Sequence, residues 1–206
     1  MALNWEEVRP NVDHPDGTQL IYEKALEWSK KLPEDRIFME IGCWKGGTSM
    51  AIMQAIKDSG KDRWMFSVDP YGTLPFKLGT KIQKEAIYDE AIYIDAMVNM
   101  YGYAKKLGVN YYHWRLLSDD FMMVLPNIQF WYKGEQIEPK FGFVYIDGAH
   151  NGQQVTREVN WIKERMDKGM IVMDDVPYII QDSTPTLNDI INKSYQDNFR
   201  AYYEVG

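Results

Sequence analysis

Three carboxylates follow two short apolar runs in the second half of the chain. The first run, Phe143 to Ile146, is followed by Asp147. The second, Met170 to Met173, is followed by Asp174 and Asp175. Runs of four large apolar residues without polar alternation predict strands that are buried on both faces, as in parallel sheets. Carboxylate oxygens accept hydrogen bonds, so these acids form a candidate ligand site if the fold brings them together.

The segment between the two runs, residues 153 to 168, has the pattern of a helix. Its apolar residues recur at spacings of four, three and four, which places them on one helical face: Val155, Val159, Ile162 and Met166. Strand, helix and strand within about thirty residues form a βαβ unit, which leaves its two strands parallel and adjacent. Ligands in open α/β sheets bind outside the carboxyl ends of the strands. We therefore expect the three acids to share one edge of a sheet.

The rest of the chain predicts further alternating elements and one domain over residues 1–206. Residues 1–33 form a lead-in and a helix, and residues 37–180 form the core. The expected helices are 18–32, 48–57, 85–107, 121–125 and 186–194; the expected strands are 37–41, 64–68, 110–116 and 200–205, with a small hairpin of 128–132 and 136–137. We expect residues 1–17 to be irregular and 73–84 to form a loop. The fold class is α/β, with a Rossmann-like, doubly wound, mostly parallel sheet that carries helices on both faces.

Composition limits the classes of partner and the compartment. A formal net charge of −7 argues against a general grip on nucleic-acid backbone, which needs clustered Lys and Arg. We expect no membrane partner, because no apolar run approaches the length of a membrane span. The N-terminal residues lack the pattern of a secretory signal, so a cytoplasmic location is the default. Cys43 is the only cysteine, which excludes an internal disulfide and thiolate-rich zinc sites.

A glycine-rich turn follows the first predicted strand. A dinucleotide fingerprint fails, because Glu40 and Trp44 stand where it needs another glycine two residues from Gly42. A phosphate-binding loop starting at Gly42 fails as well, because Thr48 stands where its lysine belongs. What remains is Glu-Ile-Gly-x-x-x-Gly, from Glu40 to Gly46. A structural βα turn is the alternative explanation.

Asp69 favours a ligand-binding function for this turn, since it ends the next predicted strand 23 residues after Gly46. Together the two segments resemble the first two cofactor motifs of class I S-adenosylmethionine-dependent methyltransferases. The resemblance implies that Glu40, Gly42, Gly46 and Asp69 bind S-adenosylmethionine. The fit is sensible, because that cofactor has no phosphate and an acid can accept hydrogen bonds from its ribose hydroxyls. Glu40 lies inside an apolar strand and therefore needs a partner.

The resemblance extends over residues 37 to 180. Ser118 and Asp119 look like the segment that abuts the adenine, although a solvated helix N-cap explains them almost as well. The motifs around Asp147 and Asp174 are similar to those of one branch, methyltransferase family 24 and its macrocin-type sugar O-methyltransferases. Catechol-type enzymes are more distant members, and some relatives are described as cephalosporin hydroxylases.

In that branch the matching acids bind a divalent metal, which implies a site made of Asp147, Asp174 and Asp175. Oxygen-only ligands favour Mg²⁺ or Mn²⁺. Without a cation, three adjacent carboxylates would repel one another and raise one another's pKa. The alternative is that Asp174 caps a turn and that Asp175 is solvated.

The implied activity is transfer of a methyl group from S-adenosylmethionine to a hydroxyl of a small molecule, a sugar or a catechol-like diol, with assistance from Mg²⁺. Asp147 would lie beside cofactor, metal and acceptor. His150 is the nearest candidate base, and a role in holding Asn151 or the helix start explains it equally well. A metal-dependent hydroxylase-like relative and a non-catalytic S-adenosylmethionine-binding protein are the alternatives. Only one strand is expected after Asp175 where the family has two, so the sheet edge would be shortened or completed by another chain in a homo-oligomer.

Overall fold

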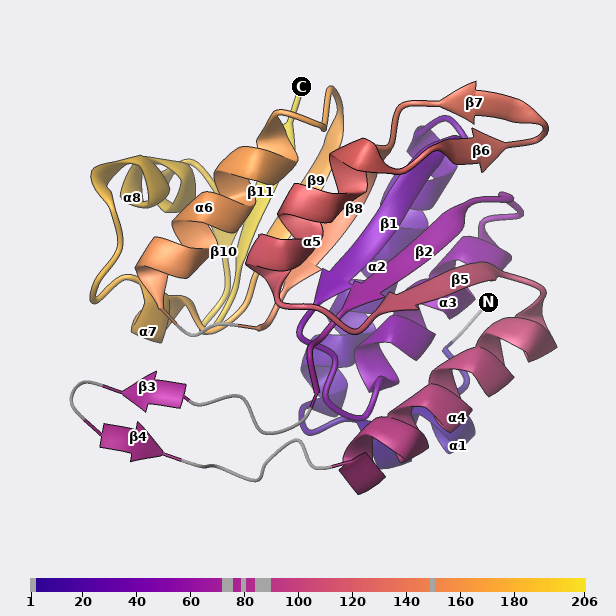
Figure 1. Cartoon of the computed structure of the whole chain (residues 1–206), viewed down its shortest axis with the longest axis horizontal. Helices are drawn as coiled ribbons and strands as arrows, with labels where there is room; N and C mark the ends of the chain where they lie inside the picture. The colour runs from indigo at the N-terminus through magenta and orange to yellow at the C-terminus, as the bar shows by residue number, and fades with distance from the viewer. Residues whose placement is uncertain (1–2, 72–75, 79–80, 84–89, 149–150) are drawn as a thin grey trace.

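The protein is a three-layer α/β sandwich around one seven-stranded sheet (Figure 1). The computed structural model describes residues 3–71, 76–78, 81–83, 90–148 and 151–206. The strand order is β10-β11-β9-β8-β1-β2-β5, in which β11 runs antiparallel to both of its neighbours and the other pairs are parallel. The strands are β1 (Arg36–Ile41), β2 (Trp64–Val68), β5 (Asn110–Trp114), β8 (Lys140–Ile146), β9 (Gly169–Met173), β10 (Tyr195–Gln196) and β11 (Ala201–Val205). The Rossmann-like fold class predicted from the sequence is confirmed.

Helices cover both faces of the sheet, because successive strand residues point to opposite sides. Phe38 of β1 packs with the first group of helices, whereas Ile37 and Met39 pack with the second. The first group is α1 (Trp5–Val8), α2 (Pro15–Lys31), α3 (Gly47–Asp58) and α4 (Glu90–Leu107), together with the 3-10 turn η1 (Arg9–Asn11). The second group is α5 (Ser118–Val124), α6 (Gly152–Lys163), α7 (Val176–Ile179) and α8 (Pro185–Asn192), with the 3-10 turn η3 (Leu125–Asn127). Within the described residues, every helix is too short or too polar to cross a bilayer.

The strand register places the predicted site residues at one edge. Ile41 lies opposite Val68 on one side and Ile146 on the other, and Ile146 lies opposite Met173. Backbone hydrogen bonds continue one residue past these pairs. Asp147 N–H donates to Ile41 O at 2.8 Å, and Asp174 N–H donates to Ile146 O at 2.9 Å. The carboxyl ends of β1, β8 and β9 therefore lie side by side. The adjacency of β8 and β9 is the one that the βαβ unit predicted.

Several predicted boundaries are wrong. The first long helix begins at Pro15, three residues before Thr18, because proline suits the first helical position. Residues 1–17 are not wholly irregular, since they contain α1 and η1. The expected helix 153–168 ends at Lys163. Two short hairpins lie outside the main sheet: β6 (Phe130–Tyr132) with β7 (Glu135–Ile137), which was expected, and β3 (Phe76–Leu78) with β4 (Lys81–Gln83), within the predicted loop 73–84.

The sheet edge beyond β9 is completed by the chain itself. The sequence predicted one strand after Asp175, but two are present, β10 and β11. The missed strand β10 has only two residues, Tyr195 and Gln196, and such a length leaves no alternating pattern to detect. A second chain is therefore not needed to pair with β11.

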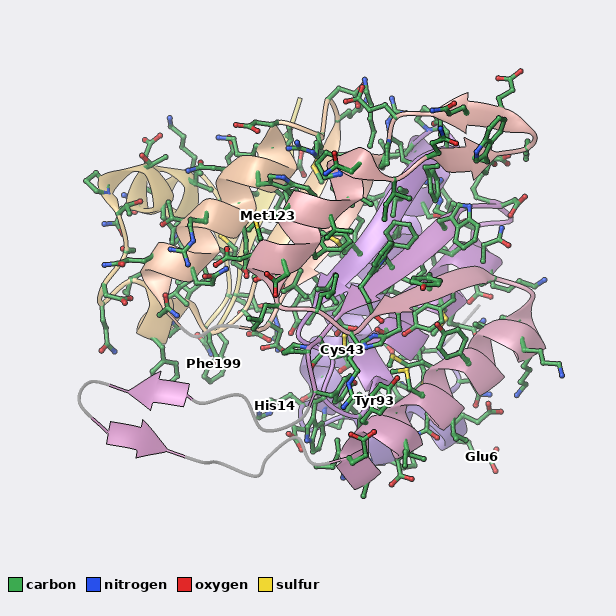
Figure 2. All side chains as sticks on the ribbon, viewed as in Figure 1. Glu6, His14, Cys43, Tyr93, Met123 and Phe199 are labelled. Carbon is green, nitrogen blue, oxygen red and sulfur yellow. The ribbon has the colours of Figure 1, made fainter. Side chains whose placement is uncertain are left out.

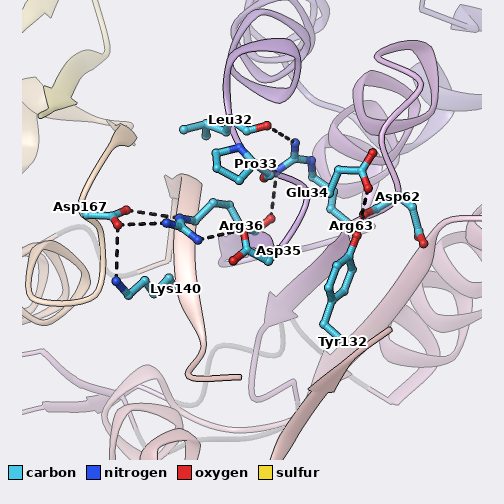
Figure 3. A network of polar contacts seen from close by, with 10 residues as sticks. All are labelled: Leu32, Pro33, Glu34, Asp35, Arg36, Asp62, Arg63, Tyr132, Lys140 and Asp167. Atoms are coloured by element: carbon cyan, nitrogen blue, oxygen red, sulfur yellow. Dashed lines mark hydrogen bonds and ion pairs between the residues drawn. The ribbon is translucent and has the colours of Figure 1, made fainter. Parts of the chain in front are cut away.

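The opposite end of the strands is fixed by a buried arginine. Arg63 is fully buried and its guanidinium donates to the carbonyls of Ser29, Leu32, Pro33 and Arg36 at 2.8 to 3.3 Å. Figure 3 draws Arg63 with three of these residues, Leu32, Pro33 and Arg36. The last carbonyls of a helix lack partners within the helix, so Arg63 caps the C-terminus of α2. Arg36, nearby, pairs with Asp167 at 2.9 Å. These contacts join α2 to the start of β1, away from the acidic edge.

Candidate active site

A cavity of about 930 Å³ lies at the carboxyl ends of β1, β8 and β9. Five segments line it: residues 11–18 with Leu20; Glu40, Gly42, Cys43, Trp44, Gly47 and Thr48; Tyr145 and Asp147; Asp174, Asp175 and Tyr178; and residues 197–200. Figure 2 labels one residue in each of three of these segments: His14, Cys43 and Phe199. All three lie near the lower edge of the sheet in that view. The glycine-rich turn and the three acids predicted from the sequence thus share one cavity.

Gly42 joins the glycine-rich turn to the acidic edge. Its φ of 85° lies in the left-handed region, and a Cβ at this position would lie 2.2 Å from the carbonyl oxygen of Asp147. Only glycine fits there, because both the conformation and the close approach exclude a side chain. Gly46, with φ of 83°, then begins helix α3 as its N-cap. The turn therefore brings the N-terminus of α3 to the cavity, where its free N–H groups attract acceptor atoms.

Glu40 reaches the cavity from inside the sheet. Its side chain is buried on the α3 face, and Ser49 Oγ of that helix donates a short hydrogen bond to Glu40 Oε2. Burial raises the pKa of Glu40 well above its ordinary value, and the charges of Asp147 and Asp69 raise it further. A cationic group bound beside Glu40 would favour its ionised form. This arrangement fits a ligand that carries an ammonium group.

Asp69 fixes the glycine-rich turn through hydrogen bonds to the backbone. Its carboxylate accepts the N–H of Cys43 at 2.8 Å and the N–H of Tyr71 at 2.9 Å. The residue is only 4% exposed and does not line the cavity, and burial raises its pKa. In this structure Asp69 therefore orients the turn, and its predicted contact with a ribose stays a prediction.

Ser118 and Asp119 are placed away from the cavity, at the start of α5. Ser118 is the first residue of the helix and Leu117 is its N-cap, so the N-cap alternative is wrong for Ser118. Ser118 Oγ donates to Glu158 Oε1 at 2.5 Å, and Gln154 Nε2 donates to Ser118 Oγ at 3.0 Å. Helix α6 thus fixes the loop that follows β5. The predicted role of both residues at the adenine stays a prediction.

Asp147 and Asp174 converge on a single tyrosine hydroxyl. Tyr145 O–H lies 3.2 Å from Asp147 Oδ2 and makes a shorter hydrogen bond to Asp174 Oδ2. Arg200 Nη2 contacts the same oxygen of Asp174 at 3.0 Å, and Asp175 N–H donates to Asp174 Oδ1 at 2.9 Å. Burial raises the pKa of Asp147 to about 8, and the charges of Asp174 and Asp175 add to the effect.

The donor set does not fit the predicted Mg²⁺ or Mn²⁺ as it is arranged. Both oxygens of Asp174 already accept hydrogen bonds, and a guanidinium occupies the position of a cation beside Oδ2. Asp175 has a positive φ of 54° and is the N-cap of α7. In the part of the chain that the structure describes, no three His, Cys, Asp or Glu residues are grouped as metal ligands. The metal was predicted from the family resemblance and the chemistry of the three acids, without Arg200.

The candidate base His150 lies outside the described residues, together with Ala149. Sequence reasoning missed two kinds of residue that line the cavity. The sequence placed Arg200 only in a predicted strand, because no motif or spacing in the sequence links it to Asp174. Tyr178 and Phe199 are exposed by 59% and 56%, and they give the cavity an aromatic wall that no motif indicated.

Comparison with known families shows the class of protein to which the chain belongs. A family model described as a methyltransferase domain matches residues 39–176, about two thirds of the chain. The chain belongs to this methyltransferase family. The matched range runs from within β1 to the start of α7, so it contains the glycine-rich turn and all three acids. The resemblance to S-adenosylmethionine-dependent methyltransferases and the prediction of an enzyme of that class are confirmed.

Solved structures with the same fold include other methyltransferases. An O-methyltransferase from Bacillus cereus in complex with SAH has 14% identity and a TM-score of 0.64, over 98% of this chain and 90% of that one. The calicheamicin methyltransferase CalS11 has 10% identity and a TM-score of 0.61, over 98% and 83% of the two chains. The O-methyltransferase NovP has 14% identity and a TM-score of 0.55, over 92% and 78%. No curated protein matches the sequence.

Proposed function

We propose that the methyltransferase moves the methyl group of S-adenosylmethionine to a hydroxyl oxygen of a small molecule, a sugar or a catechol-like diol. The observation that carries the proposal is that one cavity contains both the glycine-rich turn of the family and Asp147. The solved relatives include a TDP-rhamnose 3'-O-methyltransferase, CalS11, with 12% identity and a TM-score of 0.55, which is consistent with a sugar acceptor.

The residues around the turn suit the cofactor. Glu40 offers a buried carboxylate to the ammonium group, and Gly42 leaves the backbone open for close approach. Gly46 positions the N-terminus of α3, whose N–H groups can receive a carboxylate. When bound, S-adenosylmethionine supplies an electrophilic methyl group, which the acceptor oxygen takes as the carbon–sulfur bond breaks, leaving S-adenosylhomocysteine and a proton.

Asp147 provides the contact with the acceptor. Its carboxylate lines the cavity next to Gly42, and its Oδ2 is held by Tyr145. In its ionised form, which predominates above the raised pKa of about 8, Asp147 accepts a hydrogen bond from the acceptor hydroxyl, orients the oxygen and receives the proton that the reaction releases. Tyr178 and Phe199 contact the ring of the acceptor at the cavity wall. Mg²⁺ takes no part in this transfer, because both oxygens of Asp174 already accept hydrogen bonds and Oδ2 pairs with Arg200.

Incubation with methyl-labelled S-adenosylmethionine and a panel of sugar and catechol diols tests the proposal. We expect label on a hydroxyl oxygen of at least one member, and loss of that product in the variant Asp147→Asn. The variant Asp189→Asn is the matched control, because Asp189 is exposed on α8 and does not line the cavity. Cofactor binding without transfer to any acceptor would reject the proposed activity and favour a binding protein.

A further inference from the structure

Arg200 enters the acidic edge from the last turn of the chain. Its backbone is fixed by Asp197, which accepts the Arg200 N–H through Oδ1 at 2.7 Å and donates its own N–H to Arg200 O at 3.0 Å. The guanidinium then reaches Asp174 Oδ2 at 3.0 Å, and the two side chains are only 10% and 9% exposed. This is a nearly desolvated ion pair, unlike the surface pairs elsewhere in the protein, and such pairs are weakly screened by salt.

Helix α2 leaves room for the guanidinium. Gly17 lies in the first turn of this helix, and a Cβ there would lie 2.4 Å from Arg200 Nη2 and 2.7 Å from Cζ. Any other residue at position 17 would therefore push the guanidinium away from its present position. Glycine is unfavourable inside a helix, and contact with Arg200 is a physical reason for its presence. Helix α2 and the segment that precedes β11 thus meet at the guanidinium of Arg200.

We propose that Arg200 is the resident cation of this site and that the enzyme transfers methyl groups without a divalent metal. The guanidinium balances Asp174, which lets the Tyr145 hydroxyl bridge Asp174 and Asp147. Arg200 is a positioning residue in this arrangement, since it acts on Asp147 through Asp174 and Tyr145. Metal-independent methyl transfer rests on the proposed function, whereas the role of Arg200 as the cation beside Asp174 does not.

Titration calorimetry with Mn²⁺ alone tests the cation without any need for activity. We expect no binding to the unaltered chain up to about 1 mM Mn²⁺, a range in which weak carboxylate sites fill. The variant Arg200→Gln removes the guanidinium and leaves three acids at one edge, so we expect it to gain one Mn²⁺ site. Arg36→Gln is the matched control, because Arg36 also pairs with an aspartate, Asp167, but at the opposite end of the strands (Figure 3).

Gly17→Ala provides a second route if Arg200→Gln folds poorly. It changes no charge, and its added methyl group displaces the guanidinium from Asp174, so we expect Mn²⁺ binding here as well. Arg200→Lys keeps a cation and is expected to bind no Mn²⁺. Mn²⁺ binding to the unaltered chain that disappears in Asp174→Asn would overturn the proposal. Absence of binding in both Arg200→Gln and Gly17→Ala, with melting curves that show folded protein, would overturn it too.

Activity provides the last comparison once an acceptor is known. Methyl transfer by the unaltered chain is expected to be the same with and without chelator. In Arg200→Gln we expect kcat to fall by about 10- to 100-fold, as loss of a supporting contact typically does, with recovery of part of the rate in Arg200→Lys. A chelator that abolishes transfer, while S-adenosylmethionine binding persists, would reject the metal-independent mechanism and leave the proposed function intact.

Discussion

The buried carboxyl of Glu158 should make the folded protein less stable as the pH rises. The side chain is 1% exposed, Oε1 accepts hydrogen bonds from Ser118 and Gln154, and Oε2 is buried with no hydrogen-bond partner among the described residues. Burial is the main cause that raises its pKa to about 7, from an ordinary value of 4.5. The folded protein therefore keeps the proton of Glu158 at pH values where the unfolded chain releases it.

The sign and size follow from this difference. Below pH 4.5 the carboxyl is protonated in both states, and between 4.5 and about 7 the folded state loses stability as pH rises. A difference of about 2.5 pKa units at 1.36 kcal/mol per unit corresponds to a full cost of about 3 kcal/mol, nearly complete at pH 8. The variant Glu158→Gln removes the charge and keeps the shape. The difference in free energy of unfolding between this variant and the unaltered chain should therefore rise, in favour of the variant, by about 2 kcal/mol from pH 5 to pH 8.

Unfolding of both proteins by guanidinium chloride at pH 5, 6, 7 and 8 measures this difference in free energy of unfolding. The control is Glu164→Gln, since Glu164 follows the same helix but its side chain is 73% exposed. We expect a small difference for the control that does not change with pH. A difference for Glu158→Gln that is equally constant would refute the assignment of a buried, raised-pKa carboxyl to this position.

Three further substitutions address the cavity. Gly42→Ala should lower the free energy of unfolding by about 2 kcal/mol or more, because of its positive φ and the nearby Asp147 carbonyl, and an unchanged denaturation midpoint would contradict that geometry. Glu40→Gln should weaken S-adenosylmethionine binding in calorimetry by about 30-fold, the size expected when a buried charge pair is lost; equal affinity would remove Glu40 from the site. Asp147→Asn should lower kcat by about 100-fold with a small change in cofactor affinity, and a rise in acceptor KM at unchanged kcat would limit Asp147 to binding.

The sequence predicted the parts of the fold that have a local pattern. The apolar runs before Asp147 and Asp174 and the helix between them are consecutive in the chain, so periodicity and the parallel crossover were enough to place the acids at one edge. The glycine-rich turn was recognised for the same reason. The sequence did not predict how closely the turn approaches Asp147. The contact between Gly42 and the Asp147 carbonyl depends on the pairing of β1 with β8, two strands that are far apart in the sequence.

The residues that changed the account of the site are distant in sequence. Arg200 meets Asp174 and Gly17 through the antiparallel return of β11, and no spacing rule connects these three positions. Without Arg200, the family resemblance and the three acids together favoured a metal. Ser118 was interpreted from a motif, but Glu158 on a later helix decides where its hydroxyl points. Long-range polar contacts of this kind are set by tertiary packing, which the sequence alone does not reveal.

Titration of the purified chain with S-adenosylmethionine in a calorimeter tests the central claim most directly, because that claim requires the cavity at Glu40 and Gly42 to hold the methyl donor. We expect one cofactor per chain, with binding weakened in Glu40→Gln and unchanged in Arg36→Gln. Absence of binding by the folded, unaltered chain would contradict the account of the cavity and of every step built on it.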